Sequence, residues 1–440
     1  MLSTWSAGYL PAQAVQAQRL CHVEPALVST SSQRLRPLAL VAALSGALVC
    51  LPVPAAPAKA LPEHKNAQIQ NFGDANANAL WQSFRDVKSK TRLRPLRILQ
   101  LGDSHTAGDY FTGQLRQSLQ RDYGNAGIGW LTPGYIPNQR SAQVLLRHPK
   151  KWQVVDSKQP NHTGTFPLGG LIQKPTANST LEIKIKEPLL PGAWTLHLWQ
   201  QAPHDAWKVK LANGKQQALK NTEKSRAAWR HVEMAIDGSQ LDGVKLLAPK
   251  GGKLAGIVLD KNAPGVTLDA LGITGSVAAV INRWDVATLK QQLSWRSPEL
   301  IILAYGTNEA FSNDFQVATY EQELVKTIRL LRQLNPKAAV LLVGAPASAK
   351  NKPPFRKTNC SLPLPPALLD VQQSQLKIAK QEKTLYWDWA AAMGGNCIVN
   401  NWLKQTPELM RPDMVHLSKE GYYLSADRFY QALQQQINTP

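Results

Sequence analysis

Apolar and polar positions follow two different patterns along this chain of 440 residues. Towards both ends of the chain, continuous apolar runs typical of buried parallel strands occur at 94–101, 300–304, 339–344 and 384–389. Segments with helical periodicity alternate with them, at 74–90, 109–122, 319–334 and 418–437. This alternation predicts an α/β fold with a mostly parallel sheet.

The middle of the chain has a different pattern, in which short alternating runs lie between turn residues. The clearest runs are 181–187, 194–199 and 207–215, and both Asn213-Gly214 and Gly251-Gly252 predict hairpin turns. About 130 residues of this kind predict an antiparallel β-sandwich inserted into the α/β domain. We therefore expect one α/β domain made of residues 61–134 and 267–440, with an inserted domain at 135–266.

The first sixty residues have the features of a secretory leader. Arg34 and Arg36 precede the apolar run 38–51, and Ala58-Lys59-Ala60 follows as a cleavage site. The run is shorter than the roughly 20 residues of a membrane span. A lipoprotein signal at Cys50 is the weaker alternative. We expect a periplasmic or otherwise secreted protein, with no stable membrane span after cleavage.

The composition of the chain gives it a strong positive charge. The formal net charge is +20, and the leader holds four basic residues and one acidic residue, so the remaining chain keeps +17. Such a charge favours an anionic polymer as partner, and for an exported protein the candidates are cell wall and membrane surface. A generally soluble basic surface is the alternative. No nucleic-acid-binding motif accompanies the charge, so a nucleic-acid partner is not expected.

Only two cysteines, Cys360 and Cys397, remain once Cys21 and Cys50 leave with the leader. Export favours a disulfide between them. Two unpaired thiols are the alternative.

Three residues have the chemistry of a serine hydrolase. Ser104, in LQLGDSHTAGDY, follows an apolar strand and precedes a helix, which places its hydroxyl at the carboxyl edge of the sheet. Asp413 and His416, in RPDMVHLSKEGY, lie just before the last helix, at a spacing that lets one loop deliver an imidazole and its orienting carboxylate. Each motif alone is common by chance.

Two further motifs can supply an oxyanion hole. Asn308, in AYGTNEA, follows the strand at 300–304 and can direct its amide N–H to the same edge. Gly275, in LDALGITGSVAA, can present a backbone N–H without a side chain in the way. Helix capping by Asn308 and an ordinary turn at Gly275 are the structural alternatives.

Taken together, the order Ser, Gly, Asn and Asp-x-x-His resembles the block pattern of the SGNH/GDSL hydrolases. The resemblance implies a flavodoxin-like three-layer α/β/α fold, with Ser104 as nucleophile, His416 as base and Asp413 as orienting acid. It also implies an oxyanion hole formed by the backbone N–H groups of Ser104 and Gly275 and the side chain of Asn308.

Two features of the sequence favour one group of enzymes within that family. His105 follows the nucleophile in place of leucine, and a β-rich insertion separates the serine and glycine blocks. Both features resemble the periplasmic peptidoglycan O-acetylesterases, whose inserted domain is similar to a carbohydrate-binding module. This resemblance implies removal of acetyl groups from the C6 hydroxyl of N-acetylmuramic acid, without a cofactor. The other candidates are a polysaccharide O-acetyltransferase with the same fold and a non-catalytic glycan-binding protein.

Aromatic residues and histidines of the insertion leave some questions open. Strand alternation assigns Trp207 to the core, whereas four other tryptophans could be core or sugar-stacking residues: Trp152, Trp194, Trp199 and Trp229. The histidines outside the triad appear scattered in sequence, at His162, His197, His204 and His231, so no metal site is expected. His105 is interpreted as a structural residue or one at the substrate's edge.

Overall fold

The computed structural model describes residues 68–148, 152–187, 189, 191–201, 207–221 and 229–439. The predicted leader lies outside the described residues, as does His204. The described residues form one compact unit. Among the described helices, none has both the length and the apolarity that a membrane crossing requires.

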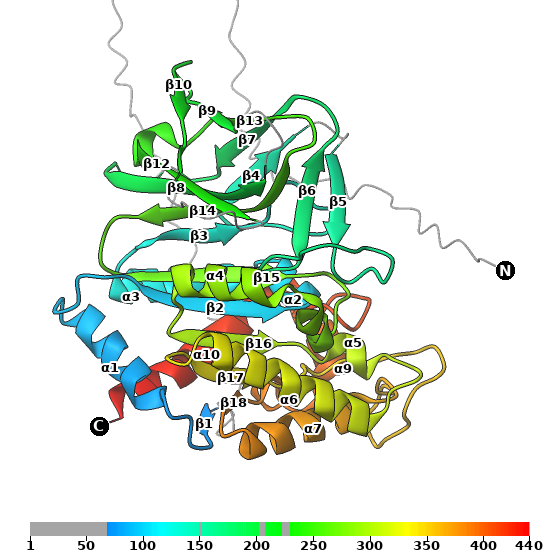
Figure 1. Ribbon diagram of the computed structural model, residues 1–440. Coiled ribbons are helices and arrows are strands. Elements are labelled where there is room, and N and C mark those ends of the chain that lie inside the picture. Colours follow the sequence, from blue (N-terminus) through cyan, green and yellow to red (C-terminus); the bar gives the residue numbers. More distant parts are fainter. Residues whose placement is uncertain are drawn as a thin grey trace, which may run out of the picture. The chain divides into compact units, whose positions relative to one another are not determined.

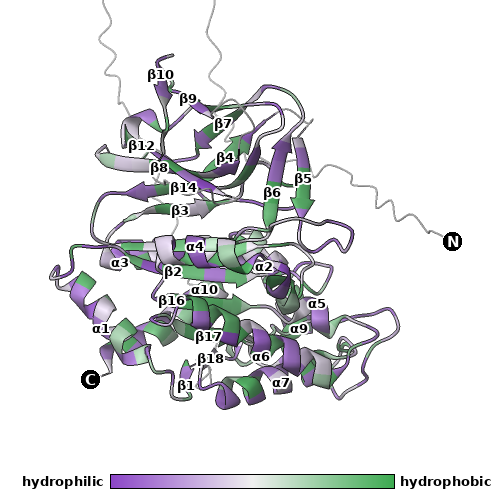
Figure 2. Cartoon of the chain, viewed as in Figure 1, coloured by the Kyte–Doolittle hydropathy of each residue, from purple (hydrophilic) through white to green (hydrophobic). Residues whose placement is uncertain are grey.

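A six-stranded sheet forms the centre of the α/β part (Figure 1). Its order is β1 (Gln70–Asn71), β18 (Leu385–Trp387), β17 (Ala339–Val343), β16 (Leu300–Ala304), β2 (Leu96–Gly102) and β15 (Val266–Gly272). Only β1 runs antiparallel to its neighbour. Strands β16 and β17 are fully buried, as their continuous apolar sequence predicts, and they are green in Figure 2.

Helices cover this sheet in two groups. The first group consists of α1 (Ala77–Lys88), α3 (Phe111–Tyr123) and α10 (Lys419–Asn438), which contact one another. The second contains α4 (Val286–Arg296), α6 (Val317–Leu334) and α7 (Leu368–Gln381). Shorter helices follow the strand ends: α2 (Ser104–Ala107), α5 (Thr307–Ala310), α8 (Trp389–Met393) and α9 (Val399–Leu403), with the 3₁₀ segments η2 (Ala278–Arg283) and η3 (Asn396–Ile398). The three-layer α/β/α fold is confirmed.

Two antiparallel sheets make up the inserted part. One has the order β10 (Gln216–Ala218), β9 (Lys208–Lys210), β13 (Val244–Ala248), β7 (Ser179–Ile185) and β4 (Val144–Arg147). The other has the order β11 (Lys220–Asn221), β12 (Arg230–Asp237), β8 (Ala193–Gln201), β14 (Lys253–Lys261), β6 (Leu171–Pro175) and β5 (Trp152–Asp156). Strand β3 (Gly127–Leu131), which precedes the predicted insertion, also pairs with β14. A 3₁₀ turn, η1 (Gly238–Gln240), follows β12.

The two predicted hairpin turns have different outcomes. Asn213-Gly214 joins β9 to β10, which pair antiparallel. The prediction at Gly251-Gly252 is wrong, because these glycines connect β13 to β14, and those strands belong to different sheets. A glycine pair marks a sharp change of direction, but it does not determine which strand the chain pairs with next.

One hydrophobic cluster spans the insertion and the α/β part, and a second fills the sandwich. A continuous cluster of buried residues includes Trp130, Trp199 and Val258 of the seven-stranded sheet, and also Leu289 and Leu293 of α4. Trp207, which the sequence assigned to the core, and the four tryptophans that it left open are all at most 7% exposed: Trp152, Trp194, Trp199, Trp207 and Trp229. They are core residues, so none of them is an exposed platform for a sugar ring.

A buried ion-pair group joins the same two parts. Arg296 of α4 is 1% exposed and binds Asp269 of β15 and Asp260 of β14, each at 2.6 Å. Burial alone would lower the pKa of Arg296, but the two carboxylates outweigh it and raise that pKa. The arginine is therefore charged, and it holds the insertion strand β14 against the parallel sheet.

Two of the histidines that seem scattered in sequence meet in this contact region. His197 of β8 lies 3.1 Å from His231 of β12, between the Nδ1 and Nε2 atoms, and Glu233 is 3.3 Å from the same Nδ1. These histidines are far apart in sequence, but strand pairing places residues 34 positions apart side by side. The three side chains could hold a metal ion.

Burial of these histidines makes folding sensitive to acid. Burial lowers the pKa of His231 to about 4 and, with the neighbouring His231, the pKa of His197 to about 2. Free histidine titrates near pH 6.5, so below that pH the unfolded chain binds more protons than the folded one. We predict that these two histidines make the free energy of unfolding fall as pH drops from about 6.5 to 4, by about 1.4 kcal/mol per pH unit for each extra proton that the unfolded chain binds. Urea unfolding at several pH values measures this dependence. The free energy of unfolding should change less steeply with pH in His231→Gln than in the wild type, and equal pH dependence of the two proteins would contradict the prediction.

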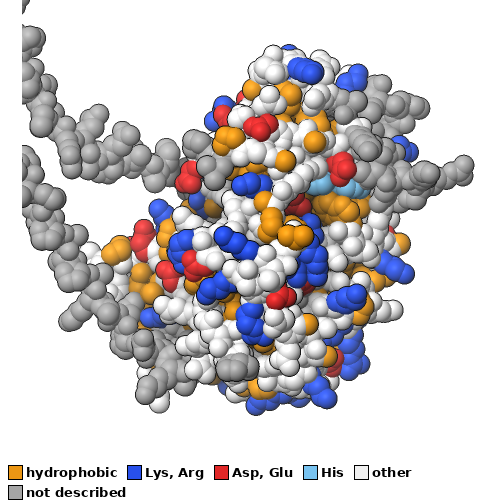
Figure 3. Space-filling view, turned by 90° about the vertical axis from the view of Figure 1, so that its left-hand side faces the viewer, with side chains coloured by type: hydrophobic (Ala, Val, Ile, Leu, Met, Phe, Trp, Pro, Cys, Tyr) orange, Lys and Arg blue, Asp and Glu red, His pale blue; other side chains and the backbone are white. Residues whose placement is uncertain are grey.

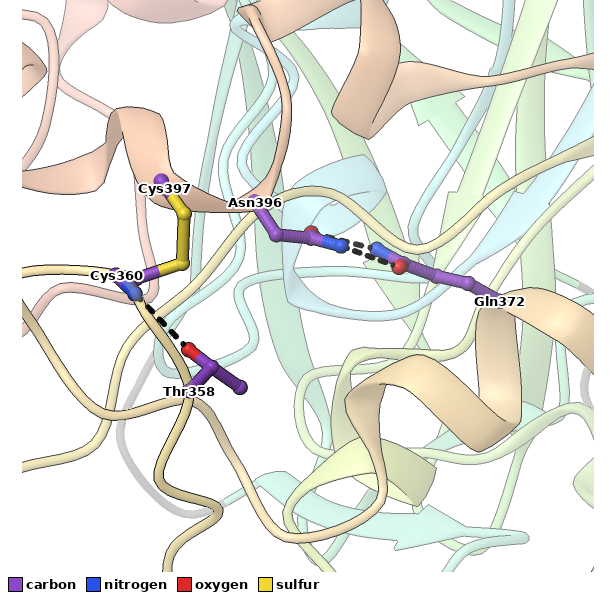
Figure 4. The surroundings of a disulfide bond; sticks show 5 residues. All are labelled: Thr358, Cys360, Gln372, Asn396 and Cys397. Atoms are coloured by element: carbon purple, nitrogen blue, oxygen red, sulfur yellow. Dashed lines mark hydrogen bonds between the residues drawn. A yellow bond between two sulfur atoms is a disulfide. The ribbon is translucent and has the colours of Figure 1, made fainter.

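The second prediction from the fold concerns the disulfide between Cys360 and Cys397, which closes a loop of 37 residues (Figure 4). Two hydrogen bonds between Gln372 and Asn396 lie beside it. Because a crosslink removes conformations from the unfolded chain, changing both cysteines to serine should lower the free energy of unfolding by about 2–4 kcal/mol. Urea denaturation measures this. Equal stability of the variant and of the unreduced wild type would contradict it.

Candidate active site

Ser104 stands at the carboxyl edge of the sheet, directly after β2. Strands β15 and β16 flank β2 in parallel, so the loops that follow all three strands meet at one edge. Gly102 permits the tight exit, because a Cβ atom there would lie 2.1 Å from Thr106 Oγ1 and 2.7 Å from the Ala304 carbonyl oxygen. Asp103 then caps the short helix α2, which begins with Ser104.

The structure brings Ser104, His416 and Asp413 together over a separation of more than 300 residues. His416 Nε2 lies 2.9 Å from Ser104 Oγ, and His416 Nδ1 lies 2.9 Å from Asp413 Oδ2. With Nδ1 donating to the carboxylate, Nε2 is left as the acceptor for the serine proton. This arrangement can deprotonate the Ser104 hydroxyl.

A strained turn presents the acid and the imidazole on the same side. Met414 adopts φ +60°, a left-handed conformation that is unusual for a residue other than glycine. Asp413 Oδ1 accepts the backbone N–H groups of Val415 at 3.0 Å and His416 at 2.9 Å. Burial raises the pKa of Asp413, but the hydrogen bonds from the His416 side chain and these N–H groups outweigh it and lower that pKa to about 2. The carboxylate therefore stays ionised at neutral pH.

Asn308 lies in the short helix α5 after β16, and Gly275 lies in the turn after β15. Asn308 Nδ2 donates one hydrogen to the Ser276 carbonyl at 2.8 Å, which fixes the amide and leaves its second hydrogen for another acceptor. Gly275 adopts φ +76°. Among the described residues, the backbone N–H groups of Ser104 and Gly275 have no hydrogen-bond acceptor. Three N–H donors are therefore left for an acceptor on the segments that follow β2, β15 and β16.

Two buried carboxyl groups that the sequence did not identify support these loops. Glu309 accepts the Gly306 N–H at 3.0 Å and the Ala278 N–H at 2.8 Å, so it connects the loop of Asn308 to the segment after Gly275. Asp103 accepts the His105 N–H at 3.0 Å. Burial raises the pKa of Glu309 to about 7 and that of Asp103 to about 6. The adjacent motifs TNEA and GDSH were the only available signals for them.

His105 is a buried residue behind the triad. Its side chain is 2% exposed, and its Nδ1 lies 2.8 Å from the Tyr422 hydroxyl of α10. The ring packs edge-on against Trp389, and its centroid is 5.4 Å from that of His416. Burial lowers the pKa of His105 to about 3, so this imidazole is neutral at neutral pH. Of the two interpretations, the structural one fits this position.

Comparisons with known protein families match both parts of the chain. A family model described as "Peptidoglycan O-acetylesterase, N-terminal" matches residues 126–238. A second, described as "GDSL-like Lipase/Acylhydrolase family", matches residues 247–424. A search of curated proteins gives no match.

Solved structures give a similar result. A structure titled "Peptidoglycan O-acetylesterase in action, 5 min" is 30% identical, with a TM-score of 0.72, and the match covers 84% of this chain and 99% of that one. A family two carbohydrate esterase from Cellvibrio japonicus is 14% identical over 67% of this chain and 98% of its own, with a TM-score of 0.27. The acetyl xylan esterase AlAXEase is 19% identical over 38% and 81%, with a TM-score of 0.29. Only the first of these three similarities is strong enough to support an argument.

Proposed function

The chain belongs to the peptidoglycan O-acetylesterase family, and from this we propose that it is an exported serine esterase that removes acetyl groups from the C6 hydroxyl of N-acetylmuramic acid. As a member of that family it is an esterase that acts on acetylated peptidoglycan. The acetylated position, the export by residues 1–60, the boundaries of the inserted domain at 135–266 and the roles of individual residues are the parts that we add.

One observation carries the assignment of roles: the hydrogen-bonded chain from Ser104 Oγ through His416 to Asp413, with 2.9 Å at each step. In the proposed reaction, His416 Nε2 accepts the Ser104 proton while Oγ bonds to the acetyl carbonyl carbon. The negative charge moves to the carbonyl oxygen, which the N–H groups of Ser104, Gly275 and Asn308 receive.

Two steps follow, which are formation of the acetyl-enzyme and its hydrolysis. The C6 oxygen of the sugar leaves with the proton that His416 carries, and Ser104 holds the acetyl group. Water next attacks the acetyl carbon as His416 takes its proton, and acetate departs as that proton returns to Oγ. Asp413, with its lowered pKa, stabilises the imidazolium formed in both steps.

Charge is consistent with a wall substrate. Figure 3 shows Lys and Arg side chains spread over one face of the molecule, in its upper and lower parts, with fewer acidic ones between them. With a net charge of +17 after the leader, this surface favours encounter with an anionic polymer.

The deciding experiment is acetate release from purified peptidoglycan. Incubation with O-acetylated sacculi should release acetate, whereas sacculi de-acetylated with mild base should give none. Net acetylation of a glycan in the presence of an acetyl donor would instead favour a transferase. Binding to sacculi without acetate release would favour a non-catalytic protein.

A further inference from the structure

A loop of the insertion reaches the oxyanion-hole glycine. It follows β5 and carries Lys158, whose Nζ donates a hydrogen bond to the Thr274 carbonyl oxygen at 2.9 Å. A Cβ atom built on Gly275 would lie 3.4 Å from the same Nζ. The ammonium group therefore lies against the turn that presents the Gly275 N–H, although it comes from a loop of the insertion.

The α/β part holds this loop firmly. Arg283, at the end of η2, donates hydrogen bonds to three of its backbone carbonyls: those of Ser157, of Gln159 at 3.0 Å and of His162 at 2.9 Å. Three bonds from one guanidinium fix the path of the backbone on both sides of Lys158.

Side chains next to Lys158 restrict it further. Asp156 Oδ1 accepts the Lys158 backbone N–H at 2.6 Å, and Trp284 Nε1 donates to Ser157 Oγ at 2.9 Å. Ser157 is fully buried. These contacts fix the backbone of Lys158, and the bond to the Thr274 carbonyl fixes its ammonium group. The side chain is therefore not a freely moving surface lysine.

Lys158 carries an uncompensated charge. It is half-buried, and no ion pair between described residues includes it. Of its three N–H donors, one serves the Thr274 carbonyl, so two are left. Asp156, the acidic residue nearest to it along the chain, is engaged with the Lys158 backbone N–H. A partly desolvated ammonium group with spare donors favours an anionic ligand.

We propose that Lys158 forms a carboxylate-binding subsite beside the oxyanion hole, through which the insertion selects an anionic substrate. The inference rests on the proposed function. Peptidoglycan offers a carboxylate from two sources: the lactyl group of muramic acid where the stem peptide is absent, and the stem peptide itself where it is present. Both have the same chemistry for Lys158, so the substrates of the test must separate them.

The test compares Lys158→Met with the wild type on a neutral ester and on two wall glycans. The glycans are O-acetylated peptidoglycan with its stem peptides and the same material after amidase has removed them. We expect KM to rise roughly five- to tenfold on at least one glycan, with kcat unchanged, and 4-nitrophenyl acetate to be hydrolysed normally. The glycan with the larger rise identifies the source of the carboxylate. Lys158→Arg should restore most of the affinity.

Matched controls separate this subsite from the proposed function. Lys208→Met removes an exposed lysine from β9 and should leave KM and kcat unchanged on all three substrates. Equal losses of Lys158→Met on 4-nitrophenyl acetate and on the glycans would overturn the subsite, as would unchanged KM on both glycans. The proposed function fails separately, if Ser104→Ala retains acetate release.

Discussion

Ser104→Ala is expected to lower kcat for an acetyl ester by roughly 10⁴- to 10⁶-fold. The alanine leaves the oxyanion donors and His416 in place but removes the only atom that forms the acyl-enzyme. The remaining rate reflects binding and oxyanion stabilisation without a covalent route. Hydrolysis of 4-nitrophenyl acetate and acetate release from O-acetylated peptidoglycan both measure the loss.

Three further variants test whether the loss is specific to the proposed nucleophile and base. His416→Ala should lose a similar factor, and the double variant should be little worse than either single one, because nucleophile and base act as a unit. Ser239→Ala, which changes an exposed serine of the insertion, should keep full activity. Thermal unfolding should be the same for all of them. If Ser104→Ala kept a tenth of the wild-type rate, Ser104 would not be the nucleophile.

Asn308→Ala should lower kcat by roughly 10²- to 10³-fold while KM changes little. The charge that this amide receives forms only in the transition state, so its loss should affect the chemical step more than substrate binding. The amide is already oriented by the Ser276 carbonyl at 2.8 Å, so it needs no rearrangement during the reaction. Steady-state kinetics on 4-nitrophenyl acetate separate the two parameters.

A matched control for this variant is Asn401→Ala, which changes an exposed asparagine on α9. It should behave as the wild type. A loss confined to KM in Asn308→Ala would instead indicate a role in binding the ground state. An unaffected enzyme would leave Ser104 and Gly275 as the complete donor set.

Sequence patterns predicted the α/β part well because its signals are local. A buried parallel strand is a continuous apolar run whatever its neighbours are, and the run at 300–304 coincides with β16. Ser104, Asn308 and Asp413 each stand directly after a predicted strand or before a predicted helix. Sheet topology then brings them to one edge without further information.

The features that the sequence could not predict depend on strand pairing between residues far apart in the chain. Gly251 and Gly252 look like a hairpin until the partners of β13 and β14 are known. His197 and His231 meet only because β8 pairs with β12. Lys158 is one of many lysines in the sequence, and its place beside Gly275 follows from the way Arg283 holds its loop.

The buried group of Arg296, Asp260 and Asp269 has a consequence for how this protein can be divided. Its charges come from an insertion strand, a helix and a strand of the parallel sheet, so cutting out the insertion would remove one of the two carboxylates that bind the buried Arg296. Breaking such a buried pair typically costs about 3–5 kcal/mol, which is a large share of a protein's total stability. The inserted sandwich is therefore not expected to fold without the hydrolase part. The two parts should be inherited and expressed together, and they should unfold in one cooperative transition.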